Sequence, residues 1–337
     1  MAKEKKKQHY VPRSYLEKWA IPGKYQVHVY NKIKKKNYIA SIRDVASERY
    51  FYDIDFTDIL AEEQLKVYGI ENCDLKHIDD DQYIENFFAK RIEDDFKIRL
   101  EDIIKHIEKM NAWEKRNCYF ISEINKANLS FGLAMQHIRV KSVRNSILDA
   151  NCCLMQVLHD MGVSQEIISQ HNISETQVPY IHGKMILNKQ SIEELSKSYF
   201  SLLWMIIINK TNVPFFTSDN PIGTKEHIHH EFISMSGLQC RGVEAYFPIN
   251  PNMILVMFDG EYHAAYANRD RYVVEIEDAN VIKHYNSLQL LNCTECVFSN
   301  SPDFSIADDM QKNNPTLFNY PRNVMKWGNK IYIPNRM

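Results

Sequence analysis

Hydrophobic positions change their spacing along the chain, and this change separates two β-rich stretches from a helical middle. Near the start, apolar and polar residues alternate over 25–30, which predicts a strand, and 49–52 predicts another. Between them, 31–37 is rich in lysine and is expected to form a turn. The protein should therefore open with a small β region.

From about residue 80, apolar residues recur three or four positions apart, as they do on one face of a helix. The apolar positions of this long helix are Ile84, Phe87, Phe88, Ile92, Phe96 and Leu100. A second helical block is expected over 113–161, interrupted near 128–132, with shorter helices over 164–169 and 192–199. The middle third of the chain is therefore predicted to be mostly α.

After residue 199 the pattern changes to continuous apolar runs, which are typical of strands covered on both faces. Such runs predict strands over 202–208, 214–217, 253–258 and 271–275. A helix is expected over 278–292, followed by a strand at 296–298. A last strand at 330–333 would close the sheet.

No Gly/Ser-rich or Pro-rich linker separates the β-rich ends from the helical centre, which favours one domain. The predicted fold is α+β, with a sheet built from both ends of the chain. The single domain is expected to span 1–337, with a β-rich opening at 1–56, a helical section at 80–200 and a β-rich section at 200–337. A chain of 337 residues with 45% hydrophobic residues is long enough to bury a sizeable core.

Charge and cysteine content narrow the classes of function. The 41 basic and 43 acidic residues give a net charge of −2, so any contact with nucleic acid has to use a local basic patch. The seven cysteines are odd in number and lack the spacing of a secreted scaffold, which favours a reducing cytoplasm. No apolar run is long enough to span a bilayer, so a soluble, cytoplasmic protein is expected.

The segment 8–16 brings a titratable imidazole, a guanidinium and two phenols together around a proline. Pro12 suits the first position of a helix, so His9 would lie just before the positive helix end and Arg13 just inside it. Free N–H groups at that end, together with Arg13, predict a site for a phosphate or carboxylate. The alternative is structural: the aromatic residues pin the N-terminus to the core and His9 satisfies a buried carbonyl.

The segment 217–221 ends an apolar strand with consecutive hydrogen-bonding side chains. Asp219 could orient His9, act as a base or bind a metal, and Asn220 could donate to a carbonyl or phosphoryl oxygen. On residue types alone, an ordinary turn stabilised by these side chains is equally expected.

In the helical block, Gln136 and Arg139 are three residues apart and share a helix face. Because Arg139 lies among apolar residues, it needs a buried partner. That partner could be Asp219, Glu85 or Glu93 in a structural ion pair, or the anionic group of a ligand. Structural pairing is the more frequent outcome.

These segments together resemble a bacterial family of unknown function, number 4238 among such families and known by its HYVP motif. The opening segment QHYVPRSYLEKW is similar to that family's signature, and the resemblance spans nearly the whole chain. Its later landmarks here are Gln136-His137-Ile138-Arg139 with Arg144, the strand end Thr217-Ser218-Asp219-Asn220-Pro221, a turn at 247–251, and a helix with Asn286 before Val297-Phe298-Ser299. The chain departs from the family at Val140-Lys141, where a Thr-Pro pair is usual. The resemblance implies candidate residues and a shared fold, but no reaction.

Three other clusters are weaker candidates. The run 226–230 contains metal-binding side chains, but no second group of ligands accompanies it, so adventitious metal binding is expected. Cys293 and Cys296 have the spacing of half a zinc site, and buried free thiols are the expected state. The basic stretches 3–7 and 32–36 could touch nucleic acid, although such runs are usually solvated.

The leading functional hypothesis is a hydrolase, a nuclease that cleaves RNA or DNA as the effector of a toxin or phage-defence module. Without a metal, His9 would act as general base or acid, Arg139 would stabilise the phosphate and Asp219 would fix the imidazole. Further candidates for substrate binding are Arg13, Gln136, Asn220, Arg144 and Asn286. With Mg²⁺, Asp219 would hold the ion together with Glu85 or Glu93.

The competing hypothesis is a non-catalytic sensor or interaction protein that binds a small anionic ligand or a phage protein. Assembly as a homo-oligomer or with a defence-system partner is compatible with either hypothesis. A third interpretation makes the segment 8–16 purely a folding latch. The chain lacks the P-loop, GxGxxG, GxSxG and HExxH motifs, so readings based on nucleotide hydrolysis, dinucleotide binding, serine esterase or zincin chemistry lose their usual support.

Overall fold

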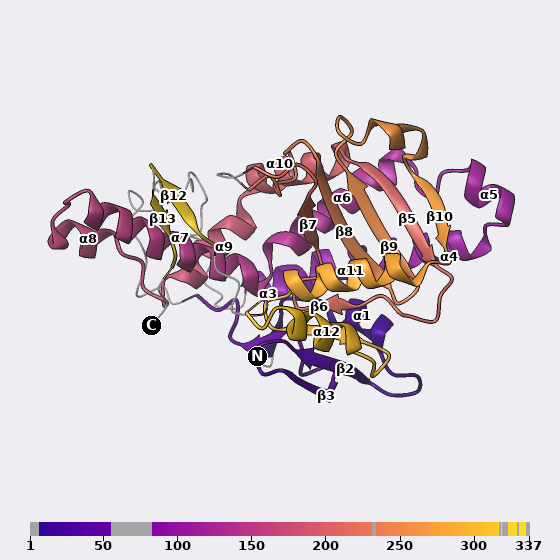
Figure 1. The fold of residues 1–337 in the computed structure, drawn as a ribbon, viewed down its shortest axis with the longest axis horizontal. Coiled ribbons are helices and arrows are strands. Elements are labelled where there is room, and N and C mark those ends of the chain that lie inside the picture. Colours follow the sequence, from indigo (N-terminus) through magenta and orange to yellow (C-terminus); the bar gives the residue numbers. More distant parts are fainter. Residues whose placement is uncertain are drawn as a thin grey trace.

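A five-stranded mixed sheet organises the C-terminal half of the computed structural model, which describes residues 7–54, 83–230, 234–316, 318, 323–328 and 330–334 (Figure 1). Its strand order is β10-β5-β9-β8-β7. The strands are β5 (Leu203–Asn209), β7 (Gly223–Glu226), β8 (Val243–Asn250), β9 (Met253–Phe258) and β10 (Tyr272–Ile276). Only β10 and β5 are parallel. The apolar runs of β5 and β9 lie inside the sheet, as predicted.

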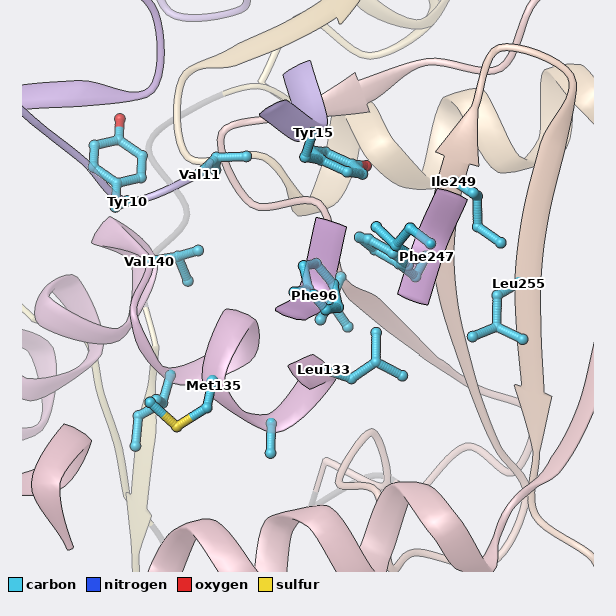
Figure 2. Packing of buried hydrophobic residues seen from close by; sticks show 14 of the residues in the cluster. Tyr10, Val11, Tyr15, Phe96, Leu133, Met135, Val140, Phe247, Ile249 and Leu255 are labelled. Carbon is cyan, nitrogen blue, oxygen red and sulfur yellow. The ribbon is translucent and has the colours of Figure 1, made fainter. Parts of the chain in front are cut away.

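Helices cover both faces of this sheet. One face packs on α4 (Glu93–Lys109), α6 (Glu123–Ile138) and α10 (Lys189–Ser201), and the other on α11 (Ala279–Asn292). Figure 2 shows the first layer, where Phe96 of α4 meets Phe247 of β8 with ring centroids 5.9 Å apart. Along β8, Phe247 joins this core while Tyr246 joins the core under α11, as the two-residue period of a strand requires.

A second, four-stranded antiparallel sheet joins the start of the chain to its later part, in the order β3-β2-β11-β6. Its strands are β2 (Gln26–Asn31), β3 (Lys36–Ser41), β6 (Thr217–Ser218) and β11 (Cys296–Ser299). The short β1 (Lys7–His9) pairs with β4 (Ser47–Arg49), and α1 (Arg13–Leu16) with η1 (Glu17–Trp19) follows β1. Strands from the N-terminal region and from the C-terminal half thus share a sheet, and the fold is α+β.

The helical section supplies the remaining layer and the periphery. Its other helices are α3 (Tyr83–Phe87), the π-helical turn η2 (Phe88–Ile92), α5 (Ala112–Asn117), α7 (Lys141–Asp160), α8 (Gln165–His171) and α9 (Val178–Leu187). Later elements are η3 (Ala264–Arg269), α12 (Ser305–Asn313), β12 (Met325–Trp327) and β13 (Lys330–Tyr332). No helix in the described part of the chain combines the length and apolar character needed to cross a bilayer.

The helical block over 113–161 is interrupted at different places from those predicted. α6 continues through 128–132, and the breaks fall at 118–122, between α5 and α6, and at Arg139 and Val140, where Val140 is extended. Gly132 lies within α6, and its lack of a side chain lets α4 approach closely, because a Cβ there would lie 2.4 Å from the Phe96 ring. The glycine serves packing and does not end the helix. The predicted start of the long helix near residue 80 lies outside the described residues.

Four predicted segments near the sheets also differ. Of 214–217, only Thr217 belongs to a strand, β6 (Thr217–Ser218), because the Asn286 side chain binds the backbone of Pro214 and Phe216. The predicted turn at 247–251 is mostly strand, since β8 continues to Asn250 through an irregularity at Pro248. The strand predicted at 330–333 pairs with β12 and packs on α7 instead of closing the main sheet. In 49–52, only Arg49 belongs to a strand.

Candidate functional site

The helix after Pro12 is a single turn. Pro12 occupies the N-cap position, with φ −57° and ψ 136°, and α1 contains only four residues. So short a helix has a weak dipole, because the dipole sums over aligned peptide units. The environment of His9 is therefore set by neighbouring side chains and not by the helix end that the sequence suggested.

His9 lies at a cavity of about 370 Å³ between the N-terminal segment and the π-helical region. The residues that line it are Lys7, His9, Arg13, Arg43, Glu85, Ala89 and Glu93. The Ile42 backbone acts on the His9 ring, while Nε2 of the ring is buried without a hydrogen-bond partner. Burial and the Arg13 charge lower the pKa of His9 to about 4, so the imidazole is neutral at pH 7.

Arg139 lies directly behind this histidine and is 1% exposed. Its Nη2 donates to the His9 carbonyl at 2.6 Å and to Glu93 Oε1 at 2.8 Å, and its Nε donates to the Tyr52 hydroxyl at 3.1 Å. Burial alone would lower the pKa of Arg139, but Tyr52 and Glu93 raise it above its usual value. Glu93 is thus the ion-pair partner among the three carboxylates considered. The Arg139 guanidinium therefore holds the His9 backbone in place through the His9 carbonyl.

Gln136 and Arg144, which belong with Arg139 to one landmark of the family, also donate to backbone carbonyls. Gln136 Nε2 donates to the Tyr10 carbonyl at 3.1 Å, next to the carbonyl that Arg139 binds. Arg144 donates to the Phe51 carbonyl and, through Nε, to His182 Nδ1 at 3.0 Å. This landmark therefore holds two N-terminal loops by their backbone.

Asp219 lies in a different environment. It is 3% exposed, and its carboxylate accepts backbone N–H bonds from Thr294 at 2.7 Å, Glu295 at 2.8 Å and Cys296 at 2.9 Å. Burial raises the pKa of Asp219 to about 6, even though these hydrogen bonds and Lys32 act in the opposite direction. Among the described residues, no hydrogen bond joins Asp219 to His9 or Arg139. The structure brings Arg139 to the backbone of His9, and Asp219 does not line the His9 cavity.

The two candidate asparagines contact backbone as well. Asn220 Nδ2 donates to the Asn292 carbonyl at 3.2 Å. Asn286 accepts from Phe216 N–H at 2.7 Å and donates to the Pro214 carbonyl at 2.9 Å. Both side chains therefore fasten the segment before and after β6 to α11.

Tyr15 connects this network to the N-terminal segment. Its hydroxyl donates to the Pro248 carbonyl at 2.7 Å and lies 2.7 Å from Thr217 Oγ1. Its ring stacks on Phe247 with centroids 5.2 Å apart, and both are seen in Figure 2. The motifs that are scattered along the sequence thus meet in one internal network around the segment 8–16.

The cavity is lined by both positively and negatively charged side chains. Lys7 pairs with Asp44, and Glu93 pairs with Arg139, whereas Arg13 and Arg43 make no ion pair with any described residue. Both arginines are exposed at the rim. Glu85 and Glu93, the two glutamates considered for Mg²⁺, lie on the same wall, but Asp219 does not join them. Within the described ranges, no three His, Cys, Asp or Glu side chains are grouped as a metal site.

Two buried polar residues were missed or misread from sequence. Lys32, expected in a solvated turn, is buried and donates to the carbonyls of Leu290 and Leu291 at 3.2 Å and to that of Cys293. Glu244 is buried on β8, where it pairs with His227 Nε2 at 2.6 Å. Both contacts join distant segments, so no local pattern marks them.

No motif in the sequence marks Arg43 as a site residue. It follows β3 and has no motif around it, and it reaches the cavity only because β1 pairs with β4.

Cys293 and Cys296 are free thiols whose pKa values are raised by burial, which keeps them protonated. The residues 3–6 of the first basic stretch lie outside the described part.

A family model described as Protein of unknown function (DUF4238) matches residues 7–303. Comparisons with curated proteins and with solved structures found no match. The matched span begins in β1 and ends after β11, so it contains every residue of the His9 cavity.

Proposed function

The chain belongs to the DUF4238 family of proteins of unknown function, and we propose that it is a hydrolase that cleaves phosphodiester bonds in nucleic acid, with the His9 cavity as its active site. One observation carries this proposal. A neutral imidazole, whose Nε2 is buried without a partner, lies beside two guanidinium groups that lack ion-pair partners among the described residues. This set supplies a proton acceptor and a binder for the phosphate.

In the proposed reaction, Nε2 of His9 accepts the proton of the attacking water or ribose hydroxyl. Arg13 and Arg43 bind the phosphate oxygens and stabilise the charge that develops on them. Arg139 positions His9 through the carbonyl that it holds at 2.6 Å. Asp219 takes no part in this scheme, because its oxygens are all engaged by the turn at 294–296.

The test is incubation of purified wild type, His9→Ala and His171→Ala with labelled RNA and DNA, with Mg²⁺ or EDTA. His171 is the control because it is exposed and, among the described residues, bonds only within its own helix. We expect His9→Ala to lose cleavage by about 10²–10⁴-fold. Thermal melts should show a stability close to that of wild type, since a substitution that removes chemistry need not remove folding.

The outcome that would contradict the proposal is intact substrate in every reaction with wild type, with or without Mg²⁺. Equal cleavage by wild type and His9→Ala would remove His9 from the chemistry. The EDTA arm decides whether Mg²⁺ is needed, for which Glu85 and Glu93 are the nearest carboxylates on the cavity wall.

A second candidate, a sensor that binds an anionic ligand without turnover, is favoured by the burial of the reactive nitrogen. His9 Nε2 is shielded from solvent, which suits a bound ligand better than direct proton transfer to water. The sensor predicts saturable binding of a phosphate-bearing ligand that Arg13→Gln weakens, with no product formed.

A further inference from the structure

The N-terminal residues of the cavity come from a basic part of the chain. Residues 7–54 contain ten lysines and arginines and four aspartates and glutamates, a net charge of +6, whereas the whole chain carries −2. Most of these cations are exposed on the β2–β3 hairpin and its neighbours: Lys24, Lys34, Lys35, Lys36, Arg43 and Arg49. Residues 7–54, the N-terminal lobe, therefore provide a local basic patch that a polyanion could contact.

A planar platform lies beside the two rim arginines. Tyr25 is 41% exposed, and the Arg43 guanidinium lies 5.6 Å from its ring centroid. The charges of both Arg13 and Arg43 act on the Tyr25 phenol, which places this ring near the cavity rim. Its hydroxyl donates to Glu17 Oε1 at 2.9 Å, and this bond restricts the ring.

These groups match one chemical class of ligand. Aromatic rings and guanidinium planes stack on unpaired bases, and every base has a face for such stacking. In a duplex the bases are stacked inside and cannot reach Tyr25. A cavity of about 370 Å³ is in the size range that admits one small molecule or nucleotide, and the rim arginines can hold its phosphate.

We propose that the His9 cavity and the Tyr25–Arg43 platform bind single-stranded nucleic acid, RNA or DNA, and discriminate against duplex. This inference rests on the proposed function for its choice of site. It adds the substrate form: one unpaired base lies on Tyr25 while the adjacent phosphate enters between Arg13 and Arg43.

The experiment is fluorescence anisotropy with labelled single-stranded RNA, single-stranded DNA and a blunt duplex of the same sequence. The His9→Ala background prevents turnover. We expect tighter binding of a single strand than of the duplex, and a loss of about 10-fold in affinity with Tyr25→Leu. Comparison of the RNA and DNA arms shows which strand is preferred.

Two matched controls separate this platform from general effects. Tyr119 is also an exposed tyrosine under a guanidinium, with Arg271 4.1 Å from its ring centroid, but it lies in the helical section. Tyr119→Leu should leave affinity unchanged. Arg43→Gln should reduce the slope of log K against log salt by about 0.7, and Arg116→Gln, an exposed arginine on α5, should not.

The outcomes separate this inference from the proposed function. Equal affinity for duplex, with no effect of Tyr25→Leu, overturns the single-strand inference even if wild type cleaves nucleic acid. Single-strand binding that depends on Tyr25, without cleavage by wild type, supports the inference and overturns the hydrolase. If no nucleic acid binds, both proposals fail.

Discussion

His9 and Arg139 are neighbours in space whose ionisation states are set in opposite directions. Burial, followed by the Arg13 charge, keeps the imidazole neutral, with a pKa lowered to about 4. The guanidinium stays charged because Glu93 and Tyr52 bind it directly and Phe88 stacks 3.9 Å below it. The charged Arg139 guanidinium thus positions the neutral His9 imidazole by binding the His9 carbonyl.

Arg139 should be essential for stability. Arg139→Met leaves the His9 carbonyl and the Tyr52 hydroxyl without their donor and Glu93 without its partner, and we expect a loss of about 3 kcal/mol or more in the free energy of unfolding. Urea denaturation measures this. The control is Arg99→Met, whose partner Asp95 is exposed one turn away and whose loss should cost less than about 1 kcal/mol. Equal, small effects would mean that Arg139 is not a structural anchor.

At the element scale, the end of α11 is held from both sides by buried charges. Lys32 donates to the last carbonyls of the helix, and Asp219 accepts the N–H groups of the turn that follows. A cation suits the negative end of a helix, and the carboxylate satisfies donors that would otherwise be buried unpaired. This turn leads α11 into β11, which pairs with β2 of the N-terminal lobe.

The two charges should be coupled. Asp219→Asn and Lys32→Met are each expected to lower the free energy of unfolding by about 2–4 kcal/mol, and the double variant should lose at least about 1 kcal/mol less than their sum. A double-mutant cycle by urea denaturation checks this. If Asp219→Asn stays folded at wild-type stability yet loses cleavage, Asp219 acts in the chemistry and its structural assignment is wrong.

At the scale of the whole molecule, burial lowers the pKa of several described histidines, most strongly at His9, His137 and His182, and this links folding to pH. The pKa values of His9 and His137 are lowered to about 4, and that of His182 to about 3, in each case first by burial. Asp219 differs, because burial raises its pKa to about 6. The three histidines and Asp219 therefore have opposite effects on how stability changes with pH.

Stability should fall as the pH drops from about 6.5 to about 4. Unfolded histidines bind protons below about 6.5, whereas the folded ones resist protonation until about 4, so acid favours unfolding. Asp219 acts oppositely, since its folded carboxyl takes up a proton near 6 and its unfolded one only near 3.8, but it opposes three histidines. Thermal melts across this range measure the sum. A melting temperature that rises on acidification would contradict it.

The sequence by itself determined the elements whose signals are local. The runs at 202–208 and 253–258 became interior strands, and the helix at 278–292 begins after Asp278, whose side chain accepts from Asn280 N–H at 2.9 Å. Periodicity and capping depend on neighbours within a few residues, so they can be read before folding. The family resemblance, now supported by the match over 7–303, rests on such local segments too.

Only the tertiary structure decided which of the marked residues meet. Asp219 binds a turn 75 residues away and Lys32 a helix end 258 residues away, while Arg43, which no motif marks, joins Arg13 at the cavity. A carboxylate or an ammonium binds whatever buried donors or acceptors the fold brings to it, because leaving either side unpaired costs more than any local preference supplies. Residue type therefore named the candidates, and packing chose among them.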